Sequence, residues 1–277
     1  MPEFSAVASH FDQEPVYDGY SSVSLFNAQF NTFDDASPDG NVLKRRIMSV
    51  APLTVMPARK VILNANERWV VGDGNNEMFM GDIVRSTYWL KKATDLVTIL
   101  TPAQVISGAA GTTAYAHRAY LKDTVQGVTD AEYYPMWDFF LSVTETVARG
   151  TFFKIGTTLY RARARHLELS GHILAVTDEL ESNNLVTVTF ADAGTFDPIT
   201  ETYSGSSSSV SGILIDSTKL YKLVTDADPK VHSGDQTLIL AANPGVGRKL
   251  TIAGVAYQVL LVTPERDAYA ARLRRQG

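Results

Sequence analysis

The sequence predicts a mainly β fold, with one or two small β-barrel or sandwich modules, an extended N-terminal arm and a short mixed insertion. Residues 235–275 carry the clearest pattern, because apolar segments there are separated by short turns rich in Gly, Pro and charged residues. Apolar residues recur at every second position, as in Tyr257, Val259 and Leu261. Such alternation buries one face of a strand and leaves the other face polar.

Residues 1–43 are predicted to form the extended arm. The segment mixes aromatic residues with Ser, Asn and Asp, and it has no helical period. Because disordered segments are usually poor in aromatic residues, we favour an arm that orders against another surface over a loosely packed terminus. The aromatic residues expected to make such contacts are Phe4, Phe11, Phe26 and Phe30.

Residues 44–104 are predicted as a first β-module. Their β-branched and aromatic runs are separated by prolines and by the turn cluster at residues 72–76. Residues 105–150 break this pattern and are predicted as an aromatic-rich insertion with some helix. Residues 102–106 can form one helical turn, and residues 114–121 fit a helix or a strand.

Residues 151–277 are predicted as a second β-module of strand-turn-strand units, interrupted by a low-complexity loop at residues 204–212. Segments 68–72, 156–162 and 253–259 share one pattern, in which a tight turn precedes an aromatic residue that opens an apolar strand. This shared pattern is compatible with a duplicated small barrel.

The composition is that of an ordinary globular chain. The 277 residues include 45% hydrophobic and 20% charged residues, which excludes wholesale disorder. The chain has no cysteine, so a disulfide framework and a thiolate zinc site are excluded. The first ten residues lack a signal-peptide pattern, and no apolar run reaches the roughly 20 residues of a membrane helix. We therefore expect a soluble chain made in the cytoplasm, without a membrane partner.

We predict no enzymatic activity, no cofactor and no metal site. His166 and His172 flank a predicted hairpin turn, but only Glu168 lies nearby to complete a metal site. Residues 73–84 resemble a calcium loop that lacks its glycine and its bidentate glutamate. Residues 245–249 lack the hydroxyl residue and the helix of a phosphate loop.

Basic residues mark the other candidate surfaces. Arg161, Arg163 and Arg165 alternate along a predicted strand, which places three guanidinium groups on one face. Solvent, local Asp or Glu, an acidic partner or nucleic acid can supply the counter-charge, and we favour a protein partner over DNA. The C-terminal basic residues expected to make contacts are Arg272, Arg274 and Arg275.

Residues 238–275, centred on residues 250–259, resemble the terminal hairpins of phage head-closure and head–tail joining proteins. They share the order of strand, glycine turn, aromatic residue, strand, charged turn, strand and arginine-rich end. Residues 68–92 and 114–180 are similar to tailed-phage virion structural proteins. That similarity rests on short motifs at residues 115–117, 120–124, 150–153 and 159–161.

The resemblance implies a neck or tail-adaptor component that assembles as a homo-oligomeric ring beneath the portal. Its partners would be further copies, the portal and other neck or tail proteins, with non-specific contact to packaged DNA as one option. The protein would be made in the host cytoplasm and reside in the virion. It departs from the short head-closure proteins in its length, its insertion and its aromatic arm.

Two other functions compete with this interpretation. A tail or baseplate module that binds host surface glycans would be favoured by exposed aromatic platforms around residues 133–137. A hydrolase would need carboxylates that converge only in three dimensions, because the sequence has no catalytic motif.

Overall fold

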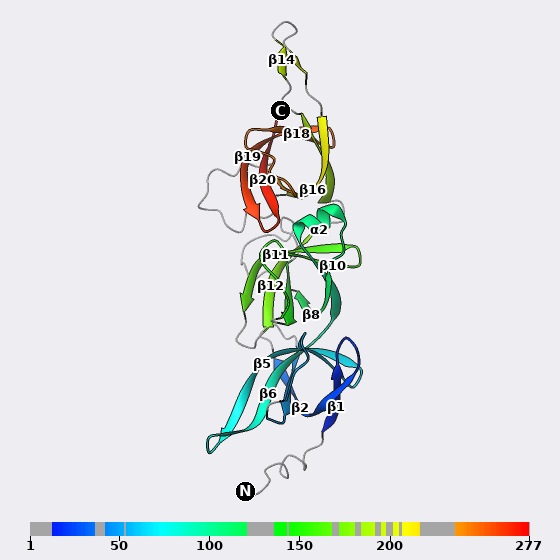
Figure 1. Cartoon of the computed structure of the whole chain (residues 1–277), viewed down its shortest axis with the longest axis vertical. Helices are drawn as coiled ribbons and strands as arrows, with labels where there is room; N and C mark the ends of the chain where they lie inside the picture. The colour runs from blue at the N-terminus through cyan, green and yellow to red at the C-terminus, as the bar shows by residue number, and fades with distance from the viewer. Residues whose placement is uncertain are drawn as a thin grey trace.

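Three closed β-barrels follow one another along the chain and lie in a row (Figure 1). This computed structural model describes residues 13–36, 42–52, 54–120, 136–142, 144–167, 172–180, 184–191, 195–197, 202–204, 207–216 and 236–276. Each barrel contains six antiparallel strands. The prediction of a mainly β fold built from small barrels is confirmed, with three barrels in place of one or two.

Barrel 1 is formed by the first six strands. They are β1 (Glu14–Asp18), β2 (Ser24–Ala36), β3 (Val42–Val50), β4 (Val61–Asn64), β5 (Glu67–Phe79) and β6 (Asp82–Lys92). Barrel 2 follows after two residues. Its strands are β7 (Asp95–Leu100), β8 (Thr112–Tyr120), β9 (Met136–Ser142), β10 (Phe152–Ile155), β11 (Thr158–Leu167) and β12 (His172–Leu180).

Barrel 3 completes the row. Its strands are β13 (Leu185–Ala191), β16 (Ser207–Asp216), β17 (Gln236–Leu240), β18 (Lys249–Ile252), β19 (Val255–Glu265) and β20 (Ala268–Arg275). The connection between the first two strands differs among the barrels. It is a short turn in barrel 1, the helix α2 (Pro102–Ser107) in barrel 2, and the hairpin of β14 (Thr195–Asp197) and β15 (Thr202–Ser204) in barrel 3.

All three barrels have the same topology. The first three strands of each form a meander, and so do the last three. The third strand pairs with the sixth, and the fourth pairs with the first, which closes the barrel. The chain therefore repeats one six-stranded barrel three times.

The hairpin of the fourth and fifth strands preserves this repeat most clearly. A two-residue turn joins these strands in every barrel, at residues 65–66, 156–157 and 253–254. Each turn contains a residue with positive φ, namely Ala65 at 48°, Gly156 at 58° and Ala253 at 48°. Positive φ is what short hairpin turns require, because it matches the twist of the flanking strands.

One buried aromatic residue follows each of these turns. Trp69, Tyr160 and Tyr257 are 3%, 3% and 7% exposed. Each is the third residue of its strand, and each pairs with the second residue of the fourth strand. The segments that share a pattern in the sequence are thus equivalent strands, and the aromatic residue fills the same place in each core.

A β-bulge occurs at the same place in every fifth strand. The register shifts after Val71, Ala162 and Val259, two residues beyond the aromatic side chain. The backbone N–H of each of these residues donates to the carbonyl of the residue before the fourth strand, at 2.8, 2.8 and 2.9 Å. Bulges bend a strand and close small barrels, so the repeated bulge belongs to the barrel design.

The structure divides the chain differently from the boundaries we predicted. Residues 24–36 of the predicted arm are β2, which pairs with β3 across the boundary at residue 43. Residues 112–120 and 136–142 of the predicted insertion are wall strands of barrel 2. The expected helical turn is present as α2, which begins after the N-cap residue Thr101.

Neighbouring barrels pack wall against wall. β5 of barrel 1 contacts β8, β9 and β12 of barrel 2. In the second junction, α2 and residues of β7, β10 and β11 pack against β16, β17 and β20. The side of one barrel that contains its fifth strand therefore meets the second, third and sixth strands of the next. No helix among the described residues is long and apolar enough to cross a membrane.

Candidate functional site

The junction between barrels 1 and 2 is built from cations and aromatic rings. Arg59, just before β4, lies 4.0 Å from the ring centre of Tyr20 and donates to Oε1 of Glu145 at 3.0 and 3.3 Å. The Tyr20 ring lies 5.0 Å from the ring of Tyr115 on β8, and Arg68 lies 4.8 Å from that second ring. Across the junction, Arg68 of barrel 1 thus stacks on a barrel 2 ring, and Arg59 of barrel 1 bonds the barrel 2 carboxylate of Glu145.

The same junction contains the partly buried His117. Its Nδ1 lies 2.8 Å from the carbonyl oxygen of Lys92, and its ring is 5.7 Å from that of Phe140. The ammonium of Lys91 lies 3.0 Å from the centre of the Phe140 ring. Burial lowers the pKa of His117, and the nearby Lys91 charge lowers it further. Burial also raises the pKa of Tyr20.

The junction between barrels 2 and 3 is mostly apolar. Phe152 of β10 points away from the core of barrel 2 and is fully buried against barrel 3. The apolar side chains that surround it in this junction are Leu100, Val105, Ile106, Leu159, Ile213, Ile215, Ile239 and Ala268. Burial of so much apolar surface makes this junction resemble a protein core.

The tip of the β19–β20 hairpin adds charged contacts to the second junction. Glu265 accepts from Arg161 of barrel 2, and their side chains are only 10% and 12% exposed. Arg266 donates to the hydroxyl of Thr151 at 2.7 Å. A Cβ atom at Gly150 would lie 2.6 Å from Glu265 Oε1, and Gly150 has a φ of 81°. Only glycine leaves room for the Glu265 carboxylate there.

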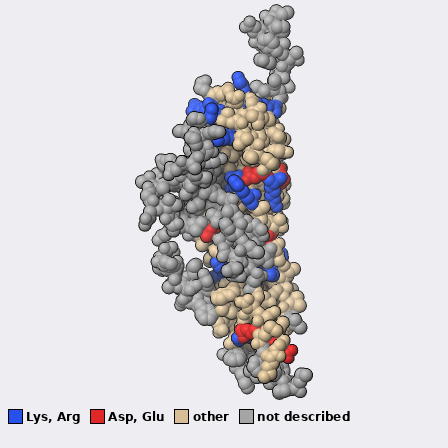
Figure 2. All heavy atoms as spheres, turned by 90° about the vertical axis from the view of Figure 1, so that its left-hand side faces the viewer, with Lys and Arg blue, Asp and Glu red and all other residues tan. Residues whose placement is uncertain are grey.

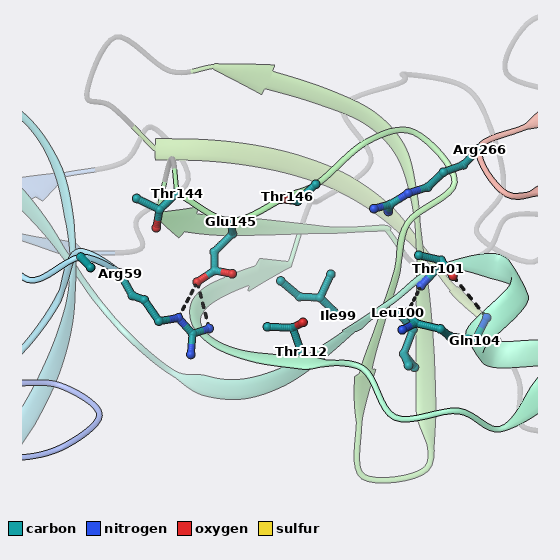
Figure 3. A pocket seen from close by; sticks show the side chains of 11 residues that line it. Arg59, Ile99, Leu100, Thr101, Gln104, Thr112, Thr144, Glu145, Thr146 and Arg266 are labelled. Carbon is teal, nitrogen blue, oxygen red and sulfur yellow. Dashed lines mark hydrogen bonds and ion pairs between the residues drawn. The ribbon is translucent and has the colours of Figure 1, made fainter.

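A polar pocket of about 510 Å³ lies along one side of barrel 2 (Figure 3). Arg59 of barrel 1 closes one end, and Arg266 of barrel 3 reaches the other. Glu145 is the carboxylate in the lining, and Arg59 neutralises it. The remaining polar lining residues are Thr101, Gln104, Thr112, Thr144 and Thr146. These hydroxyl and amide groups can hydrogen-bond a polar ligand.

The two ends of the row differ in character. The β5–β6 hairpin projects from barrel 1 (Figure 1), and Met78 and Met80 near its tip are 64% and 91% exposed. Lys249 of β18 and Arg274 and Arg275 of β20 are exposed on barrel 3, where β19 pairs with both of these strands. In Figure 2, Lys and Arg side chains gather at the upper end of the molecule, basic and acidic side chains occur together in the middle, and acidic ones appear at the lower end.

The structure places the predicted aromatic contacts as follows. Phe4 and Phe11 lie outside the described residues. Phe26 and Phe30 pack against the core of barrel 1, and Arg46 lies 4.1 Å from the Phe30 ring centre. These two residues therefore belong to a barrel wall, which corrects their assignment to an extended arm.

The predicted arginines also have different environments. Arg161 finds its counter-charge inside the chain, in Glu265. The bulge after Ala162 interrupts the simple alternation through Arg163, whose side chain, like that of Arg165, lies outside the described part of the structure. At the C-terminus, Arg272 is partly buried, and Arg274 and Arg275 are exposed.

The contacts that sequence reasoning missed join residues far apart in the chain. Arg59 and Glu145 are 86 residues apart, and Arg161 and Glu265 are 104 residues apart. No local pattern signals such pairs. Among the described residues, no group of three His, Asp or Glu side chains is placed to hold a metal ion.

Comparison with known proteins adds no relative. No family model matches the chain, and no curated protein or solved structure matches it.

Proposed function

We propose that this chain is a non-catalytic structural protein of a tailed-phage virion that joins the portal and capsid to the tail. In this proposal it forms a ring-like oligomer in the neck or tail adaptor. Its partners are further copies of itself, the portal and other neck or tail proteins.

The observation that carries the proposal is the row of three barrels with two different ends. Two internal junctions hold the barrels together through buried contacts. The row then presents a hairpin with two exposed methionines at one end and basic side chains at the other. A row with two dissimilar ends offers separate surfaces for further copies of itself and for other components.

The basic end supports contact with acidic surfaces. Lys249, Arg274 and Arg275 are exposed there and can meet carboxylates of a partner protein. The same groups can contact phosphates of passing DNA without reading its sequence. The resemblance of residues 238–275 to head-closure proteins covers β17 to β20, which form this end of the row.

The experiment that tests the proposal measures the mass of the purified chain by light scattering, followed by negative-stain imaging, with and without a portal protein. We expect closed rings, or a smaller species that forms rings only when the portal is added. A monomer that ignores virion partners would refute the neck assignment.

The polar pocket favours a second candidate, a tail or baseplate module that binds host glycans. Its threonine hydroxyls, Gln104 and Arg266 suit a ligand rich in hydroxyl groups. The aromatic platform expected near residues 133–137 does not support this candidate. Residues 133–135 lie outside the described residues, and Trp137 packs against the core of barrel 2. Glycan-array binding that is lost in Arg266→Ala would favour this candidate over the neck.

A further inference from the structure

The hairpin of the fifth and sixth strands makes an inter-barrel contact in barrel 3. Its Glu265 lies over Gly150 and Arg161 of barrel 2. Arg266 and Asp267, in the turn, bond Thr151 and the backbone N–H of Ala103. This hairpin therefore acts as a plug, and the residues around Gly150 act as its seat.

Barrel 1 has an equivalent plug. Glu77 follows the aromatic Trp69 by the same number of residues as Glu265 follows Tyr257. The cross-strand pairs Glu77–Arg85 and Glu265–Ala268 also occupy matching positions. Beyond Glu77, the hairpin of barrel 1 extends through residues 78–84, where barrel 3 has only a two-residue turn.

The barrel 1 plug is exposed and partly apolar. Met78 is 64% exposed, Met80 91% and Val84 37%. Glu77 forms an exposed ion pair with Arg85 at 2.7 Å within the hairpin. Large exposed apolar side chains at a projecting tip are typical of an interaction site, and methionine adapts readily to a partner surface.

Barrel 3 has an equivalent seat. Gly247 matches Gly150, because both have positive φ, at 83° and 81°, and both donate to the bulge residue of the fifth strand at 2.8 Å. A Cβ atom on Gly150 would collide with Glu265, whereas a Cβ atom on Gly247 meets nothing within 4 Å. The seat on barrel 3 is therefore open in the described structure.

From this correspondence we infer that the β5–β6 hairpin of one copy docks on the Gly247 seat of a second copy. The inference deepens the proposed oligomer by naming its interface. The β5–β6 hairpin and β18, which follows the seat, lie at opposite ends of the row (Figure 1), so the contact is head-to-tail. It repeats between chains the plug-and-seat contact that barrels 2 and 3 make within one chain.

The chemistry of the two surfaces is complementary. The seat has exposed Val246, 66% accessible, beside exposed Lys249. The plug offers Met78 and Met80 to the apolar part and the acidic Glu77 and Asp82 to the basic part. This pairing resembles the Glu265–Arg161 contact, in which the plug also supplies the carboxylate.

The test uses two full-length variants and sedimentation velocity over a wide range of concentration. Met78→Ser with Met80→Ser disables the plug, and Val246→Glu with Lys249→Glu disables the seat. We expect wild type to self-associate and each variant alone to weaken that association at least about tenfold. Val55→Ser is the matched control, because Val55 is 84% exposed in barrel 1 but lies outside the hairpin.

Mixing the two variants distinguishes head-to-tail pairing from other contacts. The seat-defective variant keeps a working plug, and the plug-defective variant keeps a working seat, so the mixture should form one-to-one dimers and nothing larger. A mixture that stays monomeric, or a wild type that is monomeric at every concentration, overturns the inference. Unchanged association of the plug variant does the same.

The outcome for this interface is separate from the outcome for the neck function. A chain that assembles through plug and seat but does not bind the portal would refute the neck assignment and support the interface. A monomer that binds the portal would refute the interface and keep the neck assignment.

Discussion

The two junctions bring equivalent sides of the barrels together, but different kinds of interaction stabilise them. Between barrels 1 and 2, arginines and a lysine lie over tyrosine and phenylalanine rings. Between barrels 2 and 3, an apolar cluster surrounds Phe152 beside a nearly buried ion pair. Because apolar burial is the larger stabilising contribution, we expect barrels 2 and 3 to unfold as one unit and barrel 1 to separate more readily.

The largest effect is expected for Phe152→Ala, which removes the centre of the apolar junction. The substitution should lower the free energy of unfolding by about 3–5 kcal/mol. It should also split the urea transition of barrels 2 and 3 into two. Phe153→Ala is the control, because Phe153 points into barrel 2 and stacks on Phe139 at 4.9 Å. A single unchanged transition in Phe152→Ala would contradict the comparison.

Breaking the ion pair of the same junction should have a somewhat smaller effect. Glu265→Gln leaves the Arg161 charge poorly compensated at 12% exposure, which should cost about 3 kcal/mol. Replacing both residues with leucine should recover most of this loss, because the pair then no longer needs desolvation. Urea unfolding of the single and double variants measures both effects. A double variant as unstable as the single one would show that the pair has another role.

The cation–aromatic junction should respond more weakly. Arg59→Lys keeps the charge but loses the planar contact with Tyr20 and one of the two bonds to Glu145. We expect barrel 1 to separate more easily by about 1–2 kcal/mol. Native-state hydrogen exchange of β8 amides would show this as lost protection, while β17 amides stay unchanged. Loss of protection in both strands would contradict an effect local to the first junction.

The smallest effect is a pH dependence of the first junction through His117. Its pKa in the folded chain lies below the ordinary value of 6.5, so the unfolded chain binds a proton first as the pH falls. Stability from this group is therefore complete above pH 6.5 and declines below it, toward the lower folded pKa. His117→Gln should remove that decline in an unfolding series between neutral and mildly acidic pH. An identical decline in the variant would assign it to other groups.

The sequence predicted part of the repeat, because one short hairpin keeps the same pattern in each barrel. The turn and the buried aromatic residue keep the same spacing at Trp69, Tyr160 and Tyr257. Turn geometry and core volume constrain those positions locally. The remaining strands need only alternate apolar and polar residues, so their sequences share no motif.

The predicted boundary at residue 43 cut through barrel 1, because the polar residues of β2 obscure its alternation of core-facing and outward-facing side chains. Phe26, Ala28 and Phe30 face the core, while Asn and Gln residues lie between them. The period of two was therefore present in the predicted arm. The contacts across the junctions could not be predicted from the sequence, because Arg59 and Glu145 meet only after two separate barrels have formed.

Each barrel begins and ends at the same rim, because its first and sixth strands run in opposite directions. Only Ala93 and Thr94 are needed to pass from barrel 1 to barrel 2. A gene encoding one such barrel can thus be copied in tandem without rebuilding any strand. Each duplication would add one whole barrel to the row. The distance between the two ends would therefore increase in steps of one barrel.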